Sequence, residues 1–228
     1  MKKTILTGLL MGGVVILSAD AASLYIGDVA ASGLAVPAGT IGPDGANNGE
    51  VTYAFFSADD TYTNNSGAPQ DLIITEVNFF SINAGTLTPF VAKLNGAGGA
   101  GASYDILAVG TGISGVPDLN NAAFTVAGGT NPIVTLANGE TLAAGFHQTG
   151  GPGMIAWESP DPSDGDYLAP GNSIPAGGTG ALTADTSWSD LGREYRFNVG
   201  AEIVPEPSTS LLLIPGLAGL LLFGRRRK

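Results

Sequence analysis

The sequence predicts an all-β protein, an antiparallel β-sandwich of jelly-roll kind with an N-terminal signal helix and a C-terminal transmembrane helix. Three observations lead to this prediction. The chain of 228 residues has 35 glycines and 14 prolines, and only 13% of its residues are charged. Several short segments alternate apolar and polar residues with a period of two, as half-buried strands do. No amphipathic helix interrupts them, and many short strands joined by turns are typical of a sandwich.

Residues 1–22 have the three-part layout of a secretory signal peptide. Lysines precede an apolar run over residues 5–17, and small residues follow it. We expect signal peptidase to cleave after Ala21 or Ala22. A retained membrane anchor is the alternative, but the run is short and ends at a small-residue cleavage site. The layout implies export through the secretory translocon.

The body, residues 23–203, contains the predicted strands. The clearest is 193–203, whose odd positions from Tyr195 onward are apolar and whose even positions are charged, polar or Gly. The other candidates are 23–29, 51–56, 75–79, 90–94, 104–109, 123–126, 133–136, 142–147 and 154–157. Clusters of Gly, Pro, Asn and Asp separate most of them and predict long loops at 42–49, 96–101 and 159–186.

The body is strongly acidic. Only three of the 9 lysines and arginines, Lys93, Arg193 and Arg196, lie between residues 23 and 204. Eighteen of the 20 acidic residues lie in the same stretch, so its net charge is three minus eighteen, or −15. Such a surface repels phosphate backbones and argues against a nucleic-acid partner. Solubility explains the charge, and attraction of divalent cations is the alternative.

The residue types present exclude several kinds of chemistry. The chain has no cysteine, so it forms no disulfide, zinc-thiolate site, iron-sulfur cluster or thiol nucleophile. His147 is the only histidine, and no Gly-x-Ser-x-Gly elbow accompanies it, so a structural strand histidine is the simpler interpretation. Among so many acids some pair always suits glycoside hydrolysis, which makes that signal uninformative. We therefore expect a non-catalytic protein.

One loop is a candidate calcium site. Asp161, Asp164 and Asp166 lie within six residues around Gly165, and calcium takes six to eight oxygen ligands. The spacing departs from that of an EF-hand and lacks its closing Glu, so a solvated acidic loop is the competing interpretation. No other cofactor is expected.

Three aromatic residues near this loop suggest a sugar-binding surface. Trp157, Tyr167 and Trp188 could form a platform on which the apolar faces of sugars stack. Packing of each Trp in the core is the alternative.

The tail, residues 204–228, has three consecutive parts. Pro205, Glu206 and Pro207 come first, an apolar segment at about 209–223 follows, and a basic cluster comes last. About 16 helical residues span roughly 24 Å, less than the roughly 30 Å hydrocarbon core. The terminal cations can snorkel to the headgroups, and the positive-inside bias places them in the cytoplasm and the body outside. A buried core helix is disfavoured because no polar face exists.

This order of parts closely resembles the PEP-CTERM sorting domain of Gram-negative bacteria. The matching residues are Pro205, Glu206, Pro207, Arg225, Arg226, Arg227 and Lys228. The resemblance implies recognition by an exosortase, an integral-membrane cysteine transpeptidase thought to cleave near the PEP motif, in a genome that makes exopolysaccharide. It covers only residues 204–228.

The sequence thus predicts an exported, non-catalytic cell-surface or matrix protein. A single C-terminal helix would anchor it in the inner membrane before release to the cell surface or extracellular matrix. An exopolysaccharide-binding module on the same sandwich is the alternative, and a secreted hydrolase has only export in its favour.

Overall fold

The computed structural model describes residues 23–28, 51–54, 61–96, 102–148, 154–158, 167–170, 180–183 and 194–205. At 51–54, 157–158, 167–170, 180–183 and 194 it describes the backbone alone. The regular secondary structure of these residues is entirely β, which confirms the all-β prediction. The predicted signal helix and transmembrane helix lie outside them. No helix within the described part of the chain is long and apolar enough to cross a membrane.

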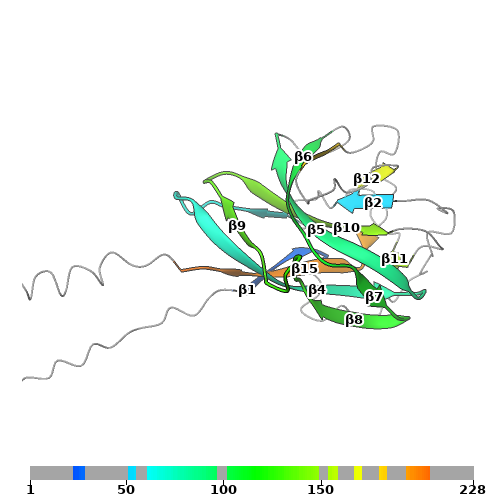
Figure 1. Ribbon diagram of the computed structural model, residues 1–228. Helices are drawn as coiled ribbons and strands as arrows, with labels where there is room; N and C mark the ends of the chain where they lie inside the picture. Colours follow the sequence, from blue (N-terminus) through cyan, green and yellow to red (C-terminus); the bar gives the residue numbers. More distant parts are fainter. Residues whose placement is uncertain are drawn as a thin grey trace, which may run out of the picture.

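The strands form two antiparallel sheets and a small third one (Figure 1). The β4 sheet has the order β1 (Ser23–Gly27), β15 (Phe197–Ile203), β4 (Gln70–Ser81) and β8 (Asp118–Ala123), with β9 (Ile133–Leu136) also paired to β4. The β5 sheet has the order β12 (Tyr167–Pro170), β2 (Val51–Ala54), β10 (Thr141–Gln148), β5 (Gly85–Asn95), β6 (Ser103–Val109) and β13 (Gly180–Thr183). In addition, β3 (Thr61–Thr63) pairs with β10, β7 (Ile113–Gly115) pairs with β5, and β11 (Trp157–Glu158) pairs with β14 (Glu194–Tyr195).

The inner faces of the two large sheets share one buried cluster. The β4 sheet contributes Ile26, Leu72, Ile74, Val77, Phe79, Phe197 and Val199, and the β5 sheet contributes Leu87, Val91, Leu142, Ala144 and Phe146. Each of these side chains is at most 1% exposed. Phe146 of β10 and Phe197 of β15 join the sheets directly, with ring centroids 5.0 Å apart. Apolar burial of this extent is the main force that holds the sheets together.

The β5 sheet is also buried on its other face. A second cluster contains Phe90, Ala92, Ala102, Tyr104, Ile106 and Ala143. In β6 the register shifts between the Val91–Ala108 and Ala92–Ile106 pairs, so Leu107 is an extra, bulged residue. Because a bulge reverses the alternation of side chains, Tyr104 and Ile106 join the second cluster while Ala108 joins the shared one.

Most predicted strands are present, but the one at 123–126 is wrong because β8 ends at Ala123. Thr75 is the extra residue of a bulge in β4, and its carbonyl accepts a 2.9 Å hydrogen bond from the N–H of Phe124. On the other side of this bulge, β9 replaces β8 as the strand paired with β4. The side-chain amide of Asn131 closes this junction by donating to two carbonyls of β4 and to the carbonyl of Phe124, just after β8. Of the strand predicted at 154–157, the structure shows only an isolated β-bridge at Ile155 and the first residue of β11.

The predicted loop 159–186 is wrong over β12 and β13. These two strands stand at opposite edges of the β5 sheet. Each is only four residues long. Short edge strands of this kind carry little hydrophobic pattern, which explains why periodicity missed them.

A buried ion pair fixes the end of β1. The side chains of Asp28 and Arg196 are 1% and 12% exposed, and a carboxylate oxygen of Asp28 accepts a hydrogen bond from Arg196. The backbone N–H of Asp28 donates to the carbonyl of Phe197 over 2.9 Å, and its carbonyl accepts from Asn198 over 3.0 Å. Asp28 therefore connects β1 to the strand beside it through three groups.

We expect Asp28→Asn to lower the free energy of unfolding by about 3 kcal/mol, because it removes the negative charge beside a largely buried guanidinium. Urea unfolding of the purified protein in detergent measures the change. Glu140→Gln is the matched control: its partner Lys93 lies 3.1 Å away and both side chains are far more exposed. That change should cost under about 1 kcal/mol. Equal losses in the two variants would contradict the role of burial.

Candidate functional site

The predicted sorting motif begins where the body ends. Ile203 pairs with Leu72 as the last residue of β15, and the N–H of Val204 still donates to the carbonyl of Asp71 over 2.9 Å. Pro205 follows and is exposed. The first residue of β1, Ser23, pairs with Glu202, so β1 begins at the same end of the body where β15 stops (Figure 1). We call this region the exit end and define it as Ser23 and residues 64–70, 137–140 and 203–205.

The loop 64–70 of the exit end is organised by one buried asparagine. The side chain of Asn64 is fully buried. Its amide nitrogen donates to the carbonyls of Ala68 (2.8 Å) and Leu136 (2.9 Å), and its amide oxygen accepts from the N–H of Ser66 (3.0 Å). Side-chain bonds of this kind replace the ladder bonds that a loop lacks. The loop is therefore held in one shape.

A second turn, 137–140, supports this loop. Asn138 accepts a hydrogen bond from the N–H of Gly67 over 2.7 Å, and the N–H of Gly139 donates to the carbonyl of Asn64 over 2.6 Å. The carboxylate of Glu140 accepts from the N–H of Ala137 over 2.7 Å and from Lys93 over 3.1 Å. These two bonds, the backbone one first, lower the pKa of Glu140.

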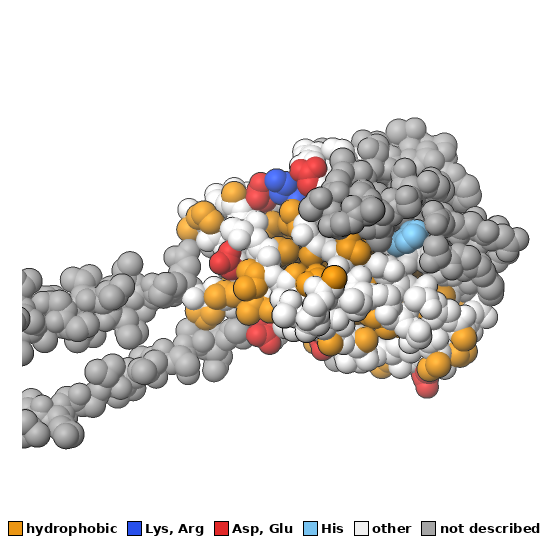
Figure 2. All heavy atoms as spheres, viewed as in Figure 1, with side chains coloured by type: hydrophobic (Ala, Val, Ile, Leu, Met, Phe, Trp, Pro, Cys, Tyr) orange, Lys and Arg blue, Asp and Glu red, His pale blue; other side chains and the backbone are white. Residues whose placement is uncertain are grey.

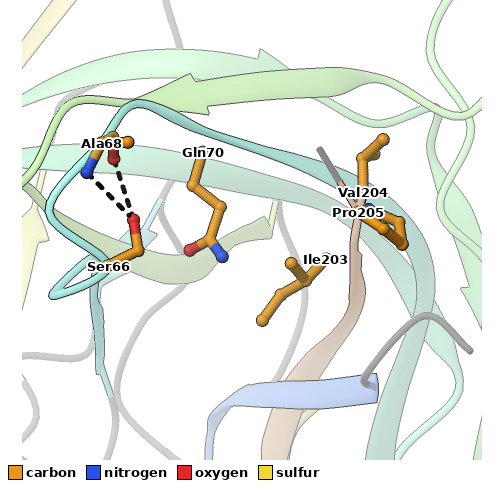
Figure 3. A pocket seen from close by; sticks show the side chains of 6 residues that line it. All are labelled: Ser66, Ala68, Gln70, Ile203, Val204 and Pro205. Carbon is orange, nitrogen blue, oxygen red and sulfur yellow. Dashed lines mark hydrogen bonds between the residues drawn. The ribbon is translucent and has the colours of Figure 1, made fainter. Parts of the chain in front are cut away.

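The exit end borders an open pocket of about 350 Å³ beside the motif (Figure 3). Its lining residues are Ser66, Ala68, Gln70, Ile203, Val204 and Pro205. Figure 3 shows the loop on one side, the end of β15 on the other, and the Gln70 side chain between them. The hydroxyl of Tyr62 donates to Gln70, and burial raises the pKa of Tyr62. The pocket thus combines amide and hydroxyl groups with an apolar wall next to Pro205.

A second candidate surface lies on the outer face of the β4 sheet. Asn198, Asn78 and Asn121 are direct cross-strand neighbours on β15, β4 and β8. Asn121 donates to the side-chain oxygen of Asn78, and Asn78 donates to that of Asn198 over 3.0 Å. Both also approach the carboxylate of Glu76, at 3.3 and 3.4 Å. We call Tyr25, Glu76, Asn78, Asn121 and Asn198 the polar face; its first four residues are accessible, whereas Asn198 is fully buried.

Gly200 gives the polar face its shape. It pairs with Tyr25 on one side and Glu76 on the other. A Cβ at Gly200 would lie 2.5 Å from Cγ of Glu76, so only glycine lets that side chain lie across β15. A hydrogen bond with Glu76 and the charge of Glu76 raise the pKa of Tyr25. A hollow of about 180 Å³ opens here, bordered by Tyr25, Thr75, Glu76 and Glu202 among others.

The structure places few of the predicted site residues. Pro205 lies at the exit end; Glu206, Pro207 and the basic cluster 225–228 lie outside the described residues. Asp161, Asp164, Asp166 and Trp188 also lie outside them, and at Trp157 and Tyr167 only the backbone is described. The calcium site and the aromatic platform therefore stay predictions. Within the described residues no group of three His, Asp or Glu side chains is arranged to hold a metal ion.

Sequence reasoning missed the polar face and the pocket. His147, which it singled out, is a half-buried residue of β10 paired with Thr52 and Thr88. The available signal for the polar face was the polar residues at alternate positions of β4 and β15. On the face seen in Figure 2 the acidic side chains (red) are scattered among uncharged ones. Among the described side chains, the acidic ones therefore form no single patch on that face.

Comparison with known proteins identifies one part of the chain. No curated protein and no solved structure matches it. Residues 204–228 match the family described as the PEP-CTERM protein-sorting motif. The match begins at Val204, the residue whose N–H makes the bond to Asp71 that ends the pairing of β15. The chain therefore carries a PEP-CTERM protein-sorting motif directly after the last strand of its body.

Proposed function

We propose that this is an exported, non-catalytic surface or extracellular-matrix protein that an exosortase sorts through its tail. The observation that carries the proposal is the sorting motif at 204–228. The motif implies an exosortase as the processing partner. Its position also supports the proposal, because it follows β15 with no further domain between them.

On this proposal the apolar segment at about 209–223 anchors the protein in the inner membrane. The four cations at 225–228 end that segment and hold it in the orientation that leaves the acidic body outside the cytoplasm. The body then passes to the cell surface or matrix after processing. We take it to be a β-sandwich of jelly-roll kind, which the cluster shared by the two sheets supports.

Replacing Pro205, Glu206 and Pro207 together by alanine should block processing, because the enzyme reads this motif. In a host that has the sorting enzyme, the variant should accumulate as unprocessed protein in the membrane fraction, as followed by immunoblotting. A variant with Asp71→Asn, which leaves the motif intact, is the control and should be processed normally. Normal processing of the triple-alanine variant would refute the sorting function.

Exopolysaccharide binding is the second candidate, and the polar face is the observation that favours it. Amide and carboxylate groups donate to and accept from sugar hydroxyls, and Tyr25 adds an aromatic ring beside the hollow. The groups are fixed by their bonds to one another, so a ligand would not have to order them. Polysaccharide binding is compatible with the sorting function, because the polar face lies on the body and the sorting motif lies in the tail.

If the polar face binds polysaccharide, Glu76→Gln should weaken binding by about tenfold, because it removes a charged acceptor and keeps the shape. Affinity electrophoresis in gels that contain the exopolysaccharide of the producing bacterium measures the effect. Asp71→Asn is the control, since Asp71 is an exposed carboxylate of the same strand and bonds to Thr135 instead. Equal retardation of both variants and the unchanged protein would exclude this surface.

A further inference from the structure

The proposed anchoring leaves very little chain between the body and the membrane. Val204 is still bonded to β4, and the apolar segment begins at about residue 209. The four residues 205–208 span at most about 14 Å when fully extended. An enzyme that acts at 205–207 must therefore lie directly beside the surface of the body.

The exit end is the part of the body that lies within this reach. Both β1 and β15 meet there, as the Ser23–Glu202 pair shows. The opposite end of β4, at Ser81, is eleven residue steps from Gln70, or about 36 Å away. The first residue of β8, Asp118, pairs with Ser81, so the connection between β7 and β8 lies at this far end. It is therefore too distant from the motif to contact the same enzyme.

We propose that the exit end is a docking surface for the membrane-embedded sorting enzyme, an inference that rests on the proposed function. The enzyme would contact the loop 64–70 and the turn 137–139 while it holds the motif. The pocket beside Pro205 would take an apolar or amide side chain from the enzyme, to match Ala68, Ile203 and Gln70.

Charge and rigidity support this partner. Residues 64–70 and 137–139 carry no charge, and Glu140 at the edge of the exit end is paired with Lys93, although the body as a whole is strongly acidic. An uncharged surface loses less free energy when an interface removes its water. The bonds of Asn64 and Asn138 hold the loops in place, so docking costs little conformational entropy.

The test places charge on the exit end of the full chain and leaves the motif unchanged. Asn65 and Pro69 are exposed, and Asn65→Glu with Pro69→Glu should slow conversion of precursor to processed protein by about tenfold or more, because docking would desolvate two unpaired carboxylates. Pulse-chase labelling in a host with the sorting enzyme measures the rate. Protease resistance of the body checks that the variant is folded.

Val116→Glu with Leu119→Glu is the matched control. Both side chains are exposed, 61% and 46%, and lie near the far end of β4, so the same two charges should leave the rate within about twofold of normal. A flexible Gly/Ser spacer of about eight residues between Val204 and Pro205 is the second test. With the spacer, the charged exit end should no longer slow processing.

Two results would overturn the inference. One is normal processing of the folded Asn65→Glu, Pro69→Glu variant while the triple-alanine motif variant stays unprocessed, which would leave the sorting function standing. The other is faster processing of Asn65→Arg with slower processing of the Glu variant, which would mean that the exit end meets anionic lipid. Slower processing of both the Arg variant and the Glu variant would support docking on the enzyme.

Discussion

The position of β15 is the constraint on which the rest of the structure depends. The strand lies between β1 and β4, and its inward side chains reach the other sheet through the contact between Phe197 and Phe146. Its outward positions, Asn198 and Gly200, carry the polar face. Its last residue is followed at once by the sorting motif. One strand thus joins the core, a candidate binding surface and the sorting motif, and damage to its pairing would reach all three.

Bulges in β4 and β6 change which side chains of these two strands face the cluster shared by the two sheets. In β4 the buried positions change from even at Leu72 and Ile74 to odd at Val77 and Phe79, and the extra residue Thr75 keeps all four on the inner face. In β6 the opposite happens, because Ile106 and Ala108 have the same parity but the bulge at Leu107 sends them to different clusters. A bulge can therefore keep apolar residues on one face of the sheet when their spacing changes, as in β4, or send evenly spaced apolar residues to opposite faces, as in β6.

These features explain what the sequence could and could not predict. Alternation from Phe197 to Ala201 marked the inner row of β15 correctly, but Asn198 and Gly200 are buried too. Asn198 donates to the carbonyl of Asp28, and the Glu76 side chain lies across Gly200. The sorting motif was predictable because its information is local to residues 204–228. The polar face was not, because the hydrogen bond between Asn78 and Asn198 joins residues 120 positions apart. Only the register of the sheet brings such residues together.

The same long separation constrains the order in which the β4 sheet can fold. Ser23 is made long before its partner Glu202, so β1 cannot pair with β15 until nearly the whole body has been synthesised. By that point the proposed anchor, which begins a few residues later, is entering the membrane. On the proposed function, the body would then complete its β4 sheet with its exit end close to the lipid surface. A body that folds next to the membrane would present its exit end there from the start, so the proposed sorting enzyme would meet the motif together with the loops that flank it.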